Sequence, residues 1–186
     1  MSKPSRPTAA APAYPTARTF FVTTSVAAGR SLFQTARMAN LFIDVLRSYM
    51  RSGKFTVHDF VVMPNHVHIL LTIPADSSVE QALQLIKGNF SYRVKKELGF
   101  QGEIWQRGFS DVRIDDEWAM KQHHEYIAQN PVKAGLAGAA EEYPFCFDFL
   151  KRQEDAGAKA HSMGASDGTR PRGCPESCPD SGYRCC

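Results

Sequence analysis

The alternation of apolar and polar positions is clearest between residues 54 and 73. Two stretches of strand-like composition, 54–63 and 66–73, are separated only by Pro64-Asn65, which predicts an antiparallel hairpin. Side chains alternate faces along a strand. One face of the second stretch is therefore wholly apolar, with Val67, Ile69, Leu71 and Ile73. The opposite face carries His66, His68, Leu70 and Thr72, so two imidazoles lie side by side on it.

Along the rest of the chain, apolar residues follow either the spacing typical of strands or the spacing typical of helices. A β-branched and aromatic run predicts a strand over 19–26. Apolar residues at helical spacing predict helices over 34–51 and from 77 to about 98, and a last helix over 115–130 follows a short strand at 109–114. With the hairpin included, the order is strand, helix, strand, strand, helix, strand, helix. This order predicts an α+β fold with a ferredoxin-like antiparallel sheet (βαββαβ) and an extra C-terminal helix.

Local signals predict where the helices begin and end. Ser77 and Glu80 have the spacing of a capping box, and Asp115 is a good N-cap for the last helix. That helix should end at Asn130, because Pro131 disfavours helical geometry in the residue before it.

Composition divides the chain of 186 residues into a domain and two tails. Residues 1–17 are rich in Pro, Ala, Ser and Thr, and residues 151–186 lose all apolar periodicity from about Gly157, so both are expected to be disordered. The patterned domain spans 18–150, and an apolar fraction of 43% is enough for a core. No run is long enough to span a membrane and no signal peptide is recognisable, so we expect a cytoplasmic protein.

Charge and cysteine content narrow the function only slightly. A net charge of +3 does not by itself indicate nucleic-acid binding. Of the five cysteines, only Cys146 lies in the patterned domain. The other four, Cys174, Cys178, Cys185 and Cys186, are too loosely spaced or too close together to favour tetrahedral zinc.

The last predicted helix supplies groups that complement the histidine pair. Tyr126 and Asn130 are four residues apart and so share one helical face. A tyrosine hydroxyl can act as a covalent nucleophile, and an amide oxygen can bind Mg²⁺ or Mn²⁺. Laid on the histidine face of the sheet, this helix would create a site suited to phosphodiester cleavage. His123 and His124 should point away from Tyr126 and remain surface or partly packed residues, and His58 is expected to be structural.

Three segments in this order resemble a known family. The stretch 63–70 resembles the His-hydrophobic-His motif of the single-strand, one-tyrosine (HUH, IS200-like) transposases. The stretches 105–111 and 126–136, followed by 142–145, resemble the REP-associated tyrosine transposase branch of that family.

The resemblance implies a metal-dependent endonuclease that cuts and rejoins single-stranded DNA near hairpins through a transient 5′-phosphotyrosine bond. It assigns His66 and His68 as ligands of Mg²⁺ or Mn²⁺ and Tyr126 as the nucleophile. Asn130 stands where the wider family often has glutamine, and becomes the third ligand. The same resemblance implies a bacterial, nucleoid-associated protein, and leaves open whether it is a monomer or a homodimer.

Single-strand binders combine basic grooves with aromatic stacking surfaces. The candidates for DNA contact are Arg107, which lies inside the shared motif, with Trp105, Lys87, Arg93 and Lys133. Two of them have simpler interpretations: Trp105 as a core residue, and Arg93 as part of a solvated helix face.

Two other functions compete with the nuclease. A non-catalytic module binding single-stranded nucleic acid would use aromatic residues on an open sheet face, where this chain has His66 and His68. A metal-binding ferredoxin-like protein without a nucleic-acid role would leave Tyr126 without a purpose.

Overall fold

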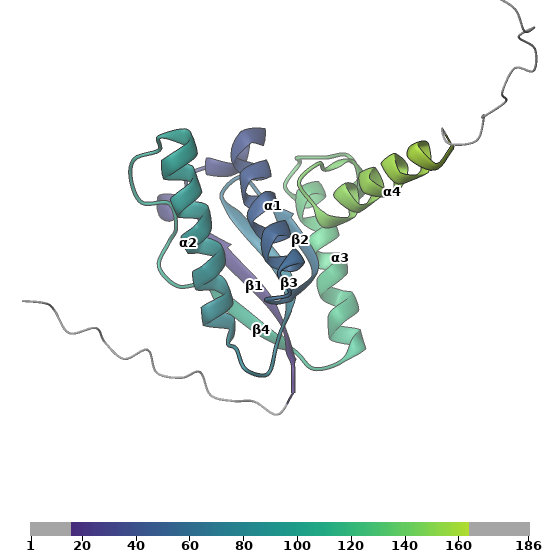
Figure 1. Cartoon of the computed structure of the whole chain (residues 1–186), viewed down its shortest axis with the longest axis horizontal. Helices are drawn as coiled ribbons and strands as arrows, with labels where there is room; N and C mark the ends of the chain where they lie inside the picture. Colours follow the sequence, from purple (N-terminus) through teal and green to yellow (C-terminus); the bar gives the residue numbers. More distant parts are fainter. Residues whose placement is uncertain (1–15, 164–186) are drawn as a thin grey trace, which may run out of the picture. The chain divides into compact units, whose positions relative to one another are not determined.

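The computed structural model describes residues 16–163 (Figure 1). Within this range the strands are β1 (Arg18–Ser25), β2 (Thr56–Val62), β3 (His66–Ile73) and β4 (Ser110–Ile114). The α-helices are α1 (Ala36–Arg51), α2 (Val79–Leu98), α3 (Glu117–Lys133) and α4 (Phe147–Met163). The chain divides into two compact units after Arg152, and the sheet belongs to the first. None of the described helices is long and apolar enough to cross a membrane.

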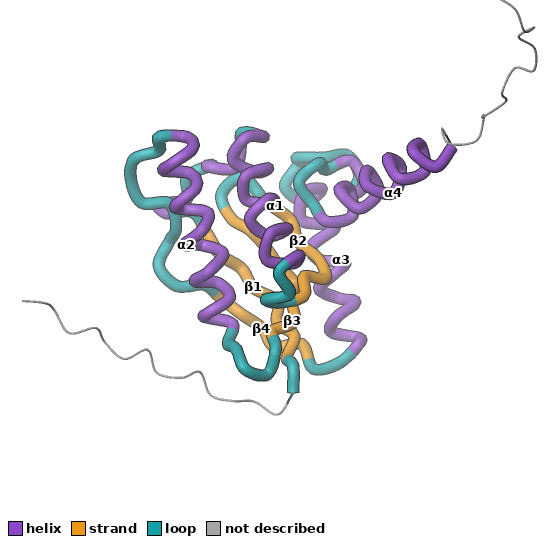
Figure 2. The backbone as a smooth tube through the Cα atoms, viewed as in Figure 1, coloured by secondary structure: helices purple, strands orange, loops and turns teal. Residues whose placement is uncertain are grey.

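The four strands form one sheet in the order β2-β3-β1-β4, with every neighbouring pair antiparallel. Helices α1 and α2 lie together against one face, and α3 lies on the other side of the sheet (Figure 2). The ferredoxin-like prediction is therefore confirmed, with α3 as the additional helix. The strand β3 has the bounds expected from the alternation.

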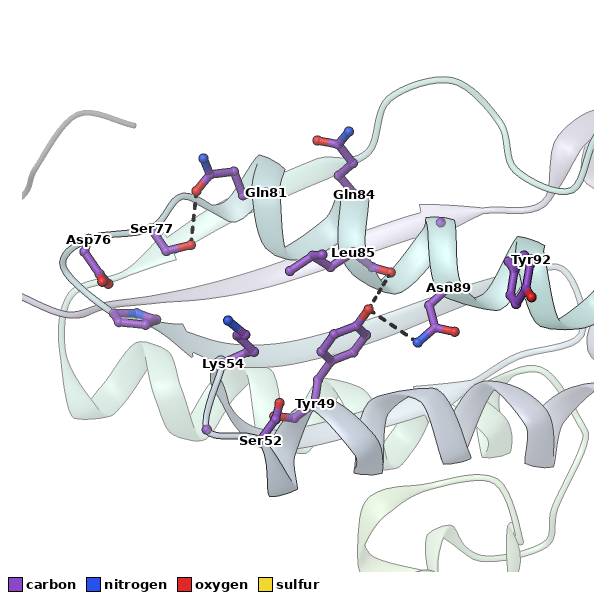
Figure 3. A pocket seen from close by; sticks show the side chains of 13 residues that line it. Tyr49, Ser52, Lys54, Asp76, Ser77, Gln81, Gln84, Leu85, Asn89 and Tyr92 are labelled. Atoms are coloured by element: carbon purple, nitrogen blue, oxygen red, sulfur yellow. Dashed lines mark hydrogen bonds between the residues drawn. The ribbon is translucent and has the colours of Figure 1, made fainter. Parts of the chain in front are cut away.

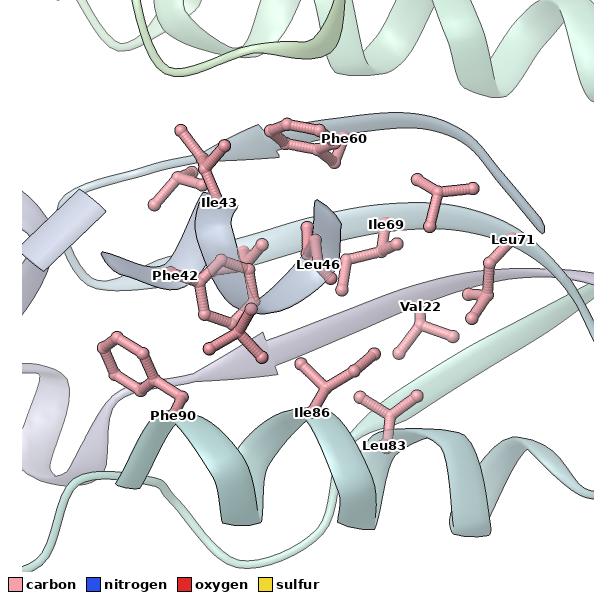
Figure 4. Packing of buried hydrophobic residues seen from close by; sticks show 14 of the residues in the cluster. Val22, Phe42, Ile43, Leu46, Phe60, Ile69, Leu71, Leu83, Ile86 and Phe90 are labelled. Atoms are coloured by element: carbon pink, nitrogen blue, oxygen red, sulfur yellow. The ribbon is translucent and has the colours of Figure 1, made fainter. Parts of the chain in front are cut away.

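The main core fills the space between the sheet and the pair α1 and α2 (Figure 4). Ile69 and Leu71 of β3 meet Phe42 of α1 and Ile86 of α2, and all four side chains are fully buried. At one end, the rings of Phe33, Phe42, Phe90 and Trp105 pack in tilted or edge-to-face pairs with ring centres 5.4–5.8 Å apart. Burial of aromatic side chains contributes much of the hydrophobic stabilisation of a domain this size.

A smaller apolar cluster attaches α3 to the opposite face. Ile127 of α3 is buried together with Phe21, Val61 and Leu70 of the sheet. Tyr143, from the segment after α3, is also buried there, and its hydroxyl donates a hydrogen bond of 2.8 Å to the carbonyl of Val62. The face that carries the two histidines is thus partly covered by α3.

Both predicted helix starts are wrong by one residue. The N-cap of α2 is Ser78, whose hydroxyl accepts from the backbone N–H of Gln81, and not Ser77. The N-cap of α3 is Asp116, whose carboxylate accepts from the backbone N–H of Ala119 at 2.7 Å, and not Asp115. In each case two adjacent residues can both cap, and packing of the following helix selects the second.

The predicted ends of two segments also differ from the structure. Helix α3 continues past Asn130 to Lys133 with a buried Pro131 inside it, because backbone hydrogen bonds resume at Ala134, which donates to Asn130. Residues 151–163, which the sequence predicts to be disordered, lie in α4. This stretch is rich in residues of high helix propensity. The remaining tail predictions, for 1–15 and 164–186, lie outside the described residues.

The capping assignment can be tested by substituting each of the two adjacent aspartates. Asp116→Ala removes the cap of α3 and should lower the free energy of unfolding by about 1 kcal/mol in urea denaturation. Asp115 makes only an exposed ion pair with Arg113, which contributes little, so Asp115→Ala should cost clearly less. A larger loss from Asp115→Ala would contradict the assignment.

Candidate functional site

The two histidines of β3 point the same ring nitrogen at each other. His66 Nε2 and His68 Nε2 are 3.1 Å apart. The other nitrogen of each ring is held by a neighbour: His66 Nδ1 lies 2.7 Å from Asn65 Oδ1, and His68 Nδ1 lies 2.8 Å from Thr23 Oγ1. Both rings are therefore fixed through Nδ1, with Nε2 facing a common point.

This arrangement fits a divalent metal. Hydrogen bonding at Nδ1 is the usual way in which proteins orient a metal-binding imidazole. Asn65 Oδ1 accepts from His66 Nδ1, and Thr23 Oγ1 can accept from His68 Nδ1, which leaves a lone pair on each Nε2. Two lone pairs 3.1 Å apart repel each other, and a cation bound by both removes that repulsion.

The surroundings keep the imidazoles neutral. Burial, with a smaller contribution from His66, lowers the pKa of His68 to about 3, and burial also lowers the pKa of His66. Metal binding requires the neutral form of histidine. The site therefore does not need to release a proton from either ring near neutral pH.

Helix α3 brings Tyr126 to the same place. The Tyr126 ring makes edge contacts with the rings of His68 and Phe21, with centres 5.3 and 5.7 Å apart. Its side chain remains 44% exposed, so a ligand can reach the hydroxyl. His68 and Tyr126, which are 58 positions apart in the sequence, thus meet across the interface between sheet and helix.

Asn130 lies half-buried on α3, one turn beyond Tyr126, and its role as a third ligand remains a prediction. Among the described residues, no group of three or more His, Cys, Asp or Glu side chains could hold a metal. A metal on the histidine pair would therefore need ligands of another kind, such as an amide, water or a phosphate oxygen. The cysteines of the proposed tail lie outside the described residues.

Two of the residues predicted to contact DNA make contacts within the protein. Trp105 is 8% exposed, packs in the main core, and donates from Nε1 to the carbonyl of Lys87 at 3.2 Å, so its ring offers no free stacking surface. Lys87 Nζ donates to the carbonyls of Gln106 and Gly108 at 3.0 and 2.9 Å, and burial lowers its pKa. Together they brace the segment that carries Arg107.

The other three candidates have different environments. Arg107 is exposed and borders a hollow of about 300 Å³ with Thr23, Ser25 and Ser110, beside the histidine pair. Lys133 Nζ lies 5.9 Å from the centre of the Tyr126 ring. Arg93 makes an ion pair with Glu97 one turn along α2, as expected of a solvated helix face.

The sequence interpretation missed a buried pair next to this site. Asp59 of β2 is 5% exposed, and its Oδ2 lies 2.7 Å from Nδ1 of His124 on α3. Burial raises the pKa of Asp59 to about 6, although the hydrogen bond from His124 opposes this shift. A charged residue between the apolar positions of β2 was the available signal, because Asp59 alternates with Val61 and so shares the face of the strand that packs under α3.

A bulge interrupts β2 between Val57 and Asp59. Phe60 and Val62 point into the main core, whereas His58 Nε2 contacts Thr72 Oγ1 at 2.6 Å on the histidine face. The expectation that His58 is structural agrees with this contact, but its expected alternation with Phe60 and Val62 is wrong. A bulge turns neighbouring side chains toward the same face.

A larger hollow lies between α1 and α2, away from the histidines. It has a volume of about 1150 Å³, and Tyr49 crosses it, donating to the carbonyl of Leu85 and accepting from Asn89, both at 3.3 Å (Figure 3). Its lining is mostly neutral and polar. The histidine face, where the two imidazoles and Tyr126 lie together, is therefore the better candidate for the functional site.

Comparisons with known proteins point to one family. A family model described as "Transposase IS200 like" matches residues 21–130. A REP-associated tyrosine transposase of Escherichia coli K12 is 27% identical over 128 residues, which cover 68% of this chain and 74% of that protein. A Haemophilus influenzae protein named for the same group is 28% identical over 94 residues, which cover 45% of this chain but only 53% of that protein.

A solved structure shares the fold. It is a REP-associated tyrosine transposase bound to a REP hairpin, with a TM-score of 0.61, 22% sequence identity, and coverage of 96% of this chain and 100% of that one.

The lowered pKa of His68 predicts how stability depends on pH in metal-free protein. The unfolded chain binds a proton at His68 near pH 6.5 and the folded chain only near pH 3. Stability is therefore fully present above pH 6.5 and is lost as the pH falls toward 3. In EDTA, His68→Gln should show a smaller loss of unfolding free energy between pH 6.5 and 5 than the unmodified chain. Equal slopes would contradict a depressed His68 pKa.

Proposed function

Because the chain belongs to the IS200-like transposase family, we propose that it is a metal-dependent transposase that cleaves and rejoins single-stranded DNA near hairpins. The observation that supports this most strongly is the contact of Tyr126 with His68, whose Nε2 faces that of His66. A nucleophile next to a pair of neutral imidazoles is what phosphodiester cleavage by this route requires.

In the proposed reaction, Tyr126 Oη attacks the scissile phosphorus. The bond from phosphorus to the 3′ oxygen breaks, a 5′-phosphotyrosine forms, the phenolic proton leaves, and the departing 3′ oxygen gains a proton. Attack by a 3′ hydroxyl on the phosphotyrosine reverses these changes and joins the strands. Exposure of Tyr126 leaves room for this exchange, because both DNA ends must reach the same phosphorus.

His66, His68 and Asn130 would hold a divalent cation, Mg²⁺ or Mn²⁺. When bound, it would polarise the phosphate and neutralise developing charge. Thr23 and Asn65 keep the two rings in position through their Nδ1 atoms. Asn130 is one methylene shorter than glutamine, so its amide has to lie closer to the histidines to serve as a ligand.

Single-stranded DNA would reach the site along the hollow beside the histidines. The hydroxyls of Thr23, Ser25 and Ser110, with the guanidinium of Arg107, form a polar surface for a phosphate-sugar backbone. Lys133, near the Tyr126 ring, adds positive charge on the other flank. The names of the E. coli relative and of the hairpin-bound structure support a hairpin-bearing strand as the substrate, and the bacterial relatives support a site of action on DNA in the bacterial cytoplasm.

A non-catalytic single-strand platform is less consistent with the geometry. Such a platform needs an open sheet face with exposed aromatic side chains. Here α3 packs on that face, Phe21 and His68 are buried beneath it, Tyr126 is exposed and His66 is half-buried.

The nucleophile can be tested with hairpin-bearing single-stranded DNA and Mn²⁺. The unmodified chain should form a protein–DNA adduct that survives denaturing electrophoresis, and Tyr126→Phe should form none, because the attacking oxygen is missing. Tyr92 is a similarly exposed tyrosine on α2, so Tyr92→Phe serves as the control and should form the adduct normally. Adduct formation by Tyr126→Phe would remove Tyr126 as the nucleophile.

The DNA path can be tested with two arginines in contrasting environments. Arg107→Ala should weaken binding of single-stranded DNA by about tenfold in fluorescence anisotropy, because charge-assisted contacts to phosphate are each worth about 1–3 kcal/mol. Arg93→Ala removes an arginine already paired with Glu97 and should change the dissociation constant less than twofold. Equal effects would show that only overall charge matters.

A further inference from the structure

We propose that Asp59 and His124 form a positioning pair that fixes the rotation of α3 and so holds the Tyr126 hydroxyl over the histidine pair. The inference rests on the proposed function in one respect only, namely that Tyr126 is the nucleophile.

The helix faces the sheet with Ile127 near the centre of its contact. At 100° per residue, His124 and Tyr126 lie on opposite flanks of that contact, separated by roughly 160° on the sheet side. His124 lies over β2, where it contacts Asp59. Tyr126 lies over β3 and β1, where its ring contacts His68 and Phe21. A roll of α3 that lifts Tyr126 from the histidines must therefore also displace His124 from Asp59.

The packing contacts of α3, which include the His123 ring against Phe21 with centres 4.6 Å apart, determine this rotation less sharply than a hydrogen bond does. Ile127 packs on Val61 and Leu70, and such contacts are non-directional. The hydrogen bond of 2.7 Å between His124 Nδ1 and Asp59 Oδ2 is directional and short. It is therefore the contact that selects one orientation among those that bury Ile127.

The position of Asp59 makes that contact costly to break. Its other oxygen, Oδ1, accepts from the backbone N–H of Phe60 at 2.8 Å, and the residue as a whole is 5% exposed. Arg152 borders the same small cavity but donates to the carbonyls of Asp148 and Glu141. If His124 moved away, a buried carboxylate would lose its side-chain hydrogen bond, which proteins strongly disfavour.

Alternation along β2 provides the local structural basis. Asp59 and Val61 are two residues apart, so they point to the same face of the strand, which is the face under α3. The bulge between Val57 and Asp59 changes the face of His58 and leaves that of Asp59 unchanged. The strand thus directs a carboxylate at α3 although it is otherwise almost wholly buried and apolar.

Variants of His124 distinguish a role in positioning Tyr126 from a role in the general stability of the fold. His124→Ala should bind hairpin-bearing single-stranded DNA within twofold of the unmodified chain, because neither Asp59 nor His124 borders the proposed DNA path. Its single-turnover rate of adduct formation should fall by about tenfold to a hundredfold, the size of effect that a misplaced reacting group produces. His124→Gln keeps an N–H donor and should recover part of the rate. Gln122→Ala, an exposed position on the same helix, should change neither quantity.

A second variant covers the case in which His124→Ala does not fold. Replacement of both members, Asp59→Leu with His124→Leu, keeps the contact apolar and should preserve thermal stability, yet adduct formation should stay slow because the directional bond is lost. Wild-type rates in this double variant, or in folded His124→Ala, would overturn the proposal.

Hydrogen exchange distinguishes a failure of this inference from a failure of the proposed function. Backbone amides of 117–133 should exchange faster in His124→Ala than in Gln122→Ala, whether or not the chain cleaves DNA. If the unmodified chain forms no adduct at all, the proposed nuclease function fails while the exchange data still test the pair. Unchanged exchange in α3 would contradict the pair's role in holding the helix.

Discussion

The register of β3 is the constraint on which the site depends. This strand lies between β2 and β1 and has both faces covered, with Val67, Ile69 and Leu71 under α1 and α2 and with His68 and Leu70 under α3. A slip of one residue would exchange the two faces. The histidines would then enter the main core and the apolar side chains would face Tyr126. Burial of the apolar set therefore fixes the position of the imidazoles.

A site built on this strand still needs a helix in a defined position. The sheet supplies the histidine pair with both rings fixed through Nδ1, and α3 supplies Tyr126 and Asn130. The small apolar cluster around Ile127 attaches the helix but leaves its rotation weakly determined. The buried contact between Asp59 and His124 provides the missing directional restraint, at a distance from the reacting groups where it need not touch DNA.

Sequence alone predicted much of this arrangement, for identifiable reasons. Period-two alternation located β3 and its two faces, and spacing on the last helix paired Tyr126 with Asn130. The helix starts failed where Ser77 and Ser78, or Asp115 and Asp116, offer equivalent caps, because only packing distinguishes them. Residue type makes Trp105 a candidate either for DNA contact or for the core, and the choice depends on three phenylalanines from other elements that pack against its ring. The face to which His58 points depends on a bulge that alternation does not reveal, and the contact between Asp59 and His124 depends on how α3 packs on the sheet.

The central claim is that Tyr126, held over the histidine pair, becomes covalently linked to the 5′ phosphate of the cleaved strand. Mass spectrometry of the adduct, after digestion of the protein with protease and of the DNA with nuclease, identifies the modified residue directly. The account predicts a nucleotide phosphate on the peptide that contains Tyr126 and on no other. A phosphate on Tyr92, Tyr143 or a serine, with the Tyr126 peptide unmodified, would contradict it.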